Sequence, residues 1–121
     1  LPTIAALTGK PLPKGRKIDG LDVSGLWKGT AIKSPREEFL HYTSRGTIEG
    51  LRSGNWKLLV KKPRRNNAAK AQVFLFDLSK DVGEKNNLAE AKPDIVKKLR
   101  ARMEALDAEI AENARQPWFK N

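Results

Sequence analysis

The sequence predicts an α+β domain in which a four-stranded antiparallel meander is covered on one face by a long C-terminal helix. Four short runs rich in strand formers lie between residues 38 and 78, and an apolar repeat with helical spacing begins near residue 93. Successive strands followed by one amphipathic helix are typical of a sheet with a helix packed on it. A chain of 121 residues suits one such domain with a real core.

Residues 1–35 predict a linker arm that begins with a short helix over residues 1–9. Pro2 suits the first turn of that helix, and Gly9 suits the position just after its end. Prolines and glycines recur through the rest of the arm, which favours an extended path with many turns. One helical turn is expected at residues 22–27. The predicted division is a linker arm, 1–35, left from the junction to a missing large domain, and a small α+β domain, 36–121.

Residues 38–78 predict the meander because short turn segments separate the apolar runs. Ser44-Arg45-Gly46 and Ser53-Gly54 suit tight hairpins, and a polar basic loop precedes the last run. Side chains alternate between the faces of a strand, so Leu58 and Leu59 point to opposite sides of the sheet. The four predicted strands are EFLHYT (38–43), TIEGLR (47–52), NWKLLVK (55–61) and QVFLFDL (72–78).

The C-terminal helix can bury only one face of this sheet. Pro93 and Asp94 fit its first turn, by preset φ and by negative charge at the positive end of the helix dipole. A sheet that is apolar on both faces needs cover on both. We therefore expect the second face to pack on a larger, absent domain, and in the isolated chain to self-associate or to be shielded by residues 1–35. The core-facing helix positions are Ile95, Val96, Leu99, Met103, Leu106 and Ile110.

Residue types exclude several kinds of catalytic site. The chain has no cysteine and a single histidine, His41, so thiolate chemistry is absent and a nucleophile–base–acid triad is not supported. Asp77, Asp81 and Glu84 are the only tight acidic group, and their spacing does not match a calcium loop. Their expected role is a turn in which Asp and Asn side chains bind backbone N–H groups. The sequence thus predicts no catalytic residue and no metal site here, and no apolar run reaches membrane-span length.

The formal net charge of +10 predicts attraction to polyanions. Five cations without an acid lie in the loop between the third and fourth predicted strands, at Lys61, Lys62, Arg64, Arg65 and Lys70. Either this loop is simply solvated or it contacts an anionic ligand. Zinc-finger, phosphate-loop and RNA-recognition signatures are missing, so nucleic-acid binding would depend on charge alone and is not favoured.

Four segments, in order, resemble motifs of the type I, formylglycine-dependent sulfatases of the alkaline phosphatase-like superfamily. The motifs are (D)xxPTxxxLxG, DGxDLxPLL, AVRxGxYKL and LYDLxxDPxExxNLA. The matching segments are LPTIAALTG (1–9), IDGLDVSGL (18–26), GLRSGNWKL (50–58) and LFDLSKDVGEKNNLA (75–89). Gly25 and Val82 depart from the usual proline, and Trp56 stands in place of tyrosine.

The resemblance implies a C-terminal subdomain, a four-stranded sheet with one long helix, beside a larger α/β domain of the same protein. The family's nucleophile, a formylglycine made within C/S-x-P-x-R, and its calcium ligands would lie upstream. The full-length protein would be a periplasmic or secreted sulfuric ester hydrolase, and this chain alone would be inactive. A first residue other than Met agrees with a fragment.

The resemblance also implies that loops of this subdomain line the substrate entrance. On that basis His41, Arg64 and Arg65 are the expected contacts to an anionic sulfated substrate, a sulfated glycan or an aryl sulfate, with residues 62–71 as the entrance loop. Two alternatives stay open. The chain could be the small domain of a related phosphodiesterase or phosphonate hydrolase, or a free-standing basic module that binds polyanions.

Overall fold

A computed structural model of the chain describes residues 1–15, 17–63 and 70–114. These residues form two compact units, which are described separately below, and the predicted boundary between residues 35 and 36 stays a prediction. None of the described helices is both long and apolar enough to cross a membrane. The units contain Leu1–Glu37 and Glu38–Glu112.

The first unit is held together by contacts between its two short helices, α1 (Pro2–Thr8) and α2 (Ser24–Trp27). Thr3 is buried, and its hydroxyl accepts a hydrogen bond from the Val23 N–H at 3.1 Å and donates to the Leu21 carbonyl at 3.4 Å. Both helices lie where the sequence predicts them. The two N-terminal motif segments therefore bind each other directly through one buried hydroxyl.

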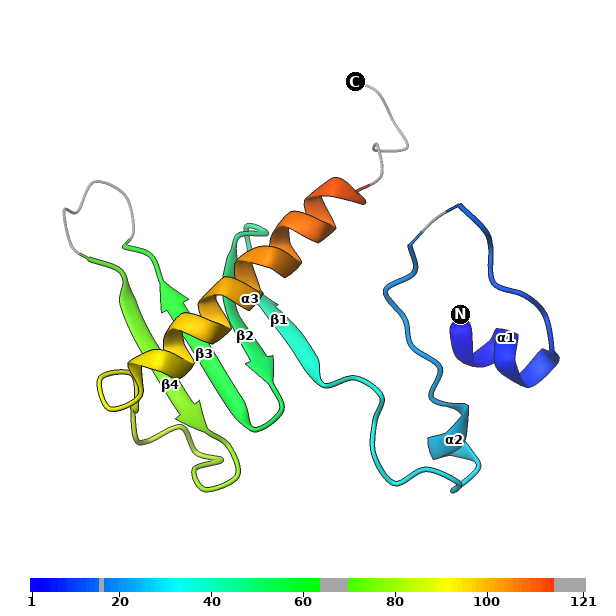
Figure 1. Cartoon of the computed structure of the whole chain (residues 1–121), viewed down its shortest axis with the longest axis horizontal. Helices are drawn as coiled ribbons and strands as arrows, with labels where there is room; N and C mark the ends of the chain where they lie inside the picture. Colours follow the sequence, from blue (N-terminus) through cyan, green and yellow to red (C-terminus); the bar gives the residue numbers. More distant parts are fainter. Residues whose placement is uncertain (16, 64–69, 115–121) are drawn as a thin grey trace. The chain divides into compact units, whose positions relative to one another are not determined.

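The second unit contains one sheet with the strand order β1-β2-β3-β4, and every neighbouring pair is antiparallel (Figure 1). This order confirms the predicted meander, and the predicted strand ends differ from the observed ones by one residue at most. A helix, α3, follows and lies across the sheet (Figure 1). The bounds are β1 Glu38–Tyr42, β2 Ile48–Ser53, β3 Trp56–Lys61, β4 Gln72–Asp77 and α3 Pro93–Glu112.

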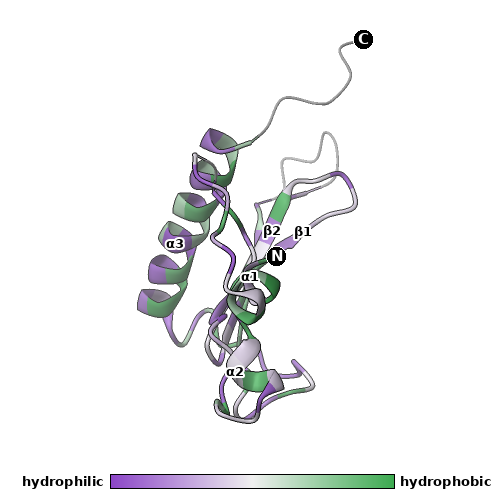
Figure 2. Ribbon diagram, turned by 90° about the vertical axis from the view of Figure 1, so that its right-hand side faces the viewer, coloured by the Kyte–Doolittle hydropathy of each residue, from purple (hydrophilic) through white to green (hydrophobic). Residues whose placement is uncertain are grey.

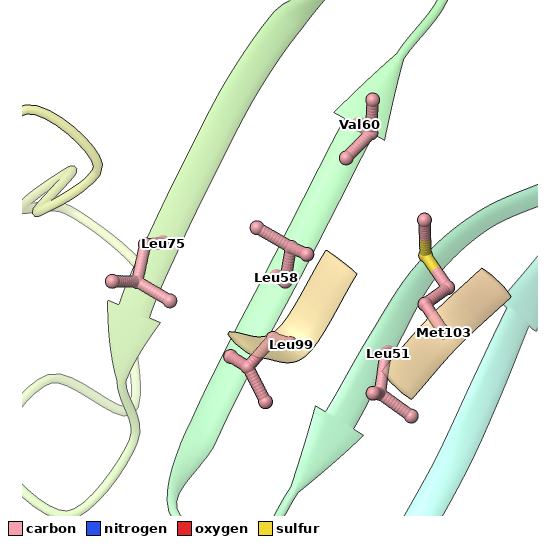
Figure 3. Close-up of a cluster of buried hydrophobic side chains, with 6 residues drawn as sticks. All are labelled: Leu51, Leu58, Val60, Leu75, Leu99 and Met103. Atoms are coloured by element: carbon pink, nitrogen blue, oxygen red, sulfur yellow. The ribbon is translucent and has the colours of Figure 1, made fainter. Parts of the chain in front are cut away.

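The core lies between α3 and one face of the sheet, as the sequence predicts. Strand register aligns one leucine from each of the four strands. The leucines of β2, β3 and β4 have no exposed surface. Leu99 and Met103 of α3 lie over this row (Figure 3). Arg102 also ties the helix to β1, because its guanidinium binds the Glu38 carboxylate at 2.7 Å and lowers the pKa of that carboxyl. The aligned leucines are Leu40, Leu51, Leu58 and Leu75.

The helix α3 has the amphipathic character that its position requires. Hydrophobic and hydrophilic residues both occur along its length (Figure 2). Leu99 and Met103 are only 6% exposed, whereas Lys97 and Lys98, directly before Leu99, are exposed. The face that meets the sheet is therefore the apolar one, as expected for a helix that covers a sheet.

The polar corner after β4 is built by side chains that bind backbone groups. Asp77 accepts a hydrogen bond from the Ser79 N–H, and Asp81 accepts one from the Asn86 N–H. These bonds lower the pKa of both carboxyl groups: the Ser79 side chain contributes most at Asp77 and the Asn86 backbone most at Asp81. The expectation of a structural turn at this corner is confirmed.

Asn87 closes the outer edge of β4. Its side-chain oxygen accepts a hydrogen bond from the Leu75 N–H at 2.9 Å, and its side-chain nitrogen donates to the Val73 carbonyl at 3.1 Å. The next residue, Leu88, donates its N–H to the Leu75 carbonyl at 2.8 Å. Asn87 and Leu88 thus form strand-like hydrogen bonds to the outer edge of β4. These bonds protect an edge that would otherwise be open to pairing.

Candidate functional site

His41 lies in the middle of β1 on the sheet face opposite α3. Its neighbour Leu40 points into the core, and side chains alternate along the strand. The His41 side chain is half-buried, and its Nε2 atom is fully buried without a hydrogen-bond partner among the described residues. Strand register places His41 in a row with Gly50, Leu59 and Phe74 across this second face.

Gly50 lies beside His41 in this row, where there is no room for a side chain. A Cβ atom at position 50 would lie 2.4 Å from the Leu58 carbonyl oxygen and 2.7 Å from Cδ2 of Leu59. Any larger residue would therefore collide with the backbone of β3 and with the Leu59 side chain that lies over the glycine. A register irregularity between His41 and Tyr42 leaves Glu49 as an extra residue in β2, next to this site.

Two cations adjoin His41 on the same face. Arg52 and Lys57 face each other across β2 and β3 in the neighbouring row. Burial lowers the pKa of His41 most; Lys57 and Arg52 lower it further, and Glu84 partly opposes them. Because its pKa is held below the ordinary value, the neutral imidazole of His41, with one donor and one acceptor, is favoured over the charged form near neutral pH.

Lys57 forms an ion pair with Glu84 that joins β3 to the polar corner. The Lys57 Nζ atom lies 2.5 Å from Oε1 of Glu84, and both side chains are mostly buried. Glu84 has a φ of 53°, a left-handed conformation that is rare for a residue with a side chain. The pair joins two segments of the sulfatase-like pattern, GLRSGNWKL and LFDLSKDVGEKNNLA. Sequence reasoning missed this contact, although both residues stand at lettered positions of the motifs.

Arg64 and Arg65 lie outside the described residues, so their predicted substrate contacts stay a prediction. The described residues that flank them are Lys61, Lys62 and Lys70, and all three are exposed. The Lys61 Nζ atom lies 5.3 Å from the centre of the Phe74 ring, a cation–π distance. Because Phe74 belongs to the row that contains His41, Lys61 at the start of the loop 62–71 and His41 share one face of the sheet.

The described residues of this surface offer cations, aromatic rings and one imidazole. No group of three or more His, Asp or Glu side chains among the described residues could hold a metal ion. The buried Nε2 of His41 has no hydrogen-bond partner in the described part of the chain. A neutral imidazole, an Arg–Lys pair and partly buried aromatic rings can recognise a ligand or a partner surface, but they do not supply a nucleophile.

The second unit is thus a small α+β unit, a four-stranded antiparallel sheet with one helix packed on it. No family model matches the chain. It is 34% identical to human arylsulfatase A over 91% of its own length, and 30% identical to human steryl-sulfatase over 88%. The chain spans about a quarter of these curated relatives, 26% and 22% of their lengths.

A solved sulfatase structure has the same fold. Its description concerns the metabolism of multiple glycosaminoglycans by Bacteroides thetaiotaomicron, and its TM-score to this chain is 0.69 at 27% identity. The match covers 88% of this chain and 23% of the solved one. The chain is therefore homologous to sulfatases over about nine tenths of its length, and its fold is that of a sulfatase C-terminal subdomain.

Proposed function

We propose that this chain is the C-terminal part of an enzyme that hydrolyses sulfate esters. The observation that carries the proposal is the extent of the similarity, which includes nearly all of this chain but only about a quarter of each sulfatase. The remaining three quarters would contain the catalytic domain. In such a protein this chain acts by supporting that domain and by shaping the way to its active site, and alone it is inactive.

The supporting role would fall to the sheet face opposite α3. Leu59 and Phe74 are only half-buried there, and Phe39 is 46% exposed. Partly exposed apolar side chains on the second face of a sheet suit a covering domain. The Lys57–Glu84 pair would hold the polar corner in place beneath that interface.

Calcium and formylglycine are proposed for the upstream domain and not for this chain. The described residues do not fit a calcium site, because no cluster of three candidate ligands occurs among them. No cysteine is available for conversion to formylglycine, and Ser34-Pro35 lacks the residue that would separate them in the family motif. An export route to the periplasm or the cell exterior belongs to the same proposal.

The substrate-facing role is proposed for the loop 62–71 and for His41. Arg64 and Arg65 would bind anionic groups beyond the sulfate that is cleaved, and neutral His41 would supply a hydrogen bond. A sulfated glycan suits this arrangement better than an aryl sulfate, because several cations can engage several anionic groups at once.

The test of this role is charge reversal in the full-length enzyme. Arg64→Glu with Arg65→Glu should raise KM for a sulfated polymer far more than KM for a small aryl sulfate. The matched control is Lys97→Glu with Lys98→Glu on α3, where both side chains are exposed. Equal effects on the two substrates, or equal effects of the two double variants, would remove the proposed substrate contact.

One rival function has an observation in its favour, because a net charge of +10 suits a free-standing polyanion-binding module. The upstream coding sequence separates the two. A C/S-x-P-x-R motif upstream supports the sulfatase, and a start codon directly before Leu1 supports the module. A phosphodiesterase or phosphonate hydrolase would carry a different nucleophile upstream, so substrate profiling of the full-length protein separates that alternative.

A further inference from the structure

The hairpin between β1 and β2 leaves the sheet at the same end as the entrance loop. Both β1 and β3 are antiparallel to β2, so they run in the same direction and end at the same side of the sheet. Figure 1 shows the β1–β2 hairpin and the end of β3 at one end of the sheet. One strand lies between them, so the two backbones are about 10 Å apart.

The hairpin holds Arg45 in a fixed backbone position. The Thr43 N–H donates to the Thr47 carbonyl at 2.8 Å, and the Gly46 N–H donates to the Thr43 carbonyl at 3.0 Å. The Thr43 hydroxyl also accepts hydrogen bonds from the N–H groups of Arg45 and Thr47. The Arg45 side chain is exposed, and its guanidinium forms no ion pair or hydrogen bond within the described ranges.

Four exposed cations therefore stand at one end of the sheet, one in the β1–β2 hairpin and three at the end of β3 or in its connection to β4. We call them the basic rim, and they are Arg45, Lys61, Lys62 and Lys70. The described residues of the two connections contain no acid. Lys62 and Lys70, like Arg45, have no ion-pair partner in the part of the chain that the structure describes. Exposed like charges without acids nearby attract anionic groups from solution.

We propose that the basic rim binds successive anionic groups of a sulfated polymer and that Arg45 is a specificity-determining residue for that substrate. The inference rests on the proposed sulfatase function for the identity of the substrate. Arg45 stands on the β1–β2 hairpin, one strand away from Lys61 and Lys62 at the end of β3. Its planar guanidinium can bind a sulfate group through two parallel N–H donors. A polymer that crosses from one connection to the other engages both, whereas a small aryl sulfate has one anionic group and gains nothing from the second.

The first test measures binding of the 121-residue chain to heparin, used as a sulfated-polymer probe, over a range of salt concentrations. Arg45→Ala should weaken binding about five-fold and reduce the slope of log affinity against log salt by about 1. Arg45→Lys should fall between the wild type and Arg45→Ala, because the charge remains but the two parallel N–H donors are lost. Lys97→Ala removes an equally exposed cation from α3 and should leave both quantities unchanged. If Arg45→Ala and Lys97→Ala weaken binding equally, the basic rim is not the binding site.

The second test uses the full-length enzyme. Arg45→Glu should raise KM for a sulfated polymer at least ten-fold, about 1.4 kcal/mol, while kcat and the KM for a small aryl sulfate stay unchanged. A rise for both substrates would show that Arg45 acts on the fold or on the catalytic centre, and it would overturn the proposal. Heparin binding that depends on Arg45 in a full-length protein without sulfatase activity would preserve the basic rim and reject the proposed function.

Discussion

Replacing Asn87 by alanine should destabilise the second unit although the residue lies in a polar surface corner. Its side chain makes three hydrogen bonds to backbone groups, to the Leu75 N–H, the Ala89 N–H and the Val73 carbonyl. Leu75 has no exposed surface, so no water can readily replace the lost acceptor at its N–H.

The expected loss of stability follows from these three bonds. A buried N–H left without an acceptor costs about 1–3 kcal/mol, and each of the two more exposed bonds contributes about 0.5–1 kcal/mol. Asn87→Ala should therefore lower the free energy of unfolding by about 2–5 kcal/mol. This is a large share of the roughly 5–15 kcal/mol that a small domain has in total.

Asn86→Ala is the matched control, because it removes the same group one residue earlier. The Asn86 side chain makes only one long contact of 3.4 Å to Asp81, and it is exposed. Its loss should change stability by less than about 0.5 kcal/mol. Urea denaturation followed by circular dichroism measures both variants, and amide exchange at Leu75 reports the β4 edge directly. Equal stability of the two variants would refute the claim that Asn87 closes this edge.

Three further changes test the second face of the sheet. Gly50→Ala should lower the free energy of unfolding by about 1–3 kcal/mol, because the new Cβ would meet the Leu58 carbonyl oxygen at 2.4 Å. An unchanged urea midpoint would show that β3 shifts to accommodate the new Cβ without loss of stability. A double-mutant cycle with Lys57→Met and Glu84→Gln should give a coupling of about 0.5–1 kcal/mol, and zero coupling would mean that the pair only fills space. Because burial lowers the pKa of His41 below its ordinary 6.5, the unfolded chain binds the proton first, and stability should fall as the pH drops below 6.5. His41→Gln should remove that part of the pH dependence, and an unchanged pH slope in urea denaturation would assign it to other groups.

The sequence was sufficient for the sheet, the helix and the structural role of the polar corner. Turn glycines such as Gly54, which has a φ of 56°, mark the hairpins, and alternating apolar residues mark the strand faces. The predicted first strand was one residue too long because Thr43 uses its N–H and its hydroxyl to close the hairpin. Such a choice depends on a partner across the turn, which local propensity does not contain.

Contacts on the second face could not be predicted, because they depend on register and on long-range proximity. Lys57 and Glu84 are 27 residues apart in the chain and meet only once β3 and the corner are in place. The environment of His41 depends on the cross-strand position of Gly50 and on the irregularity at Glu49. The position of Arg45 at the same end of the sheet as the loop 62–71 follows from strand direction, so it became visible only when the meander was established.

Sulfate release by the full-length protein tests the central claim most directly. The protein that includes the upstream region should hydrolyse an aryl sulfate, and the 121-residue chain alone should release none under the same conditions. Cleavage of phosphodiesters with no cleavage of sulfate esters by the full-length protein, or a mature protein that consists of this chain alone, would contradict the account.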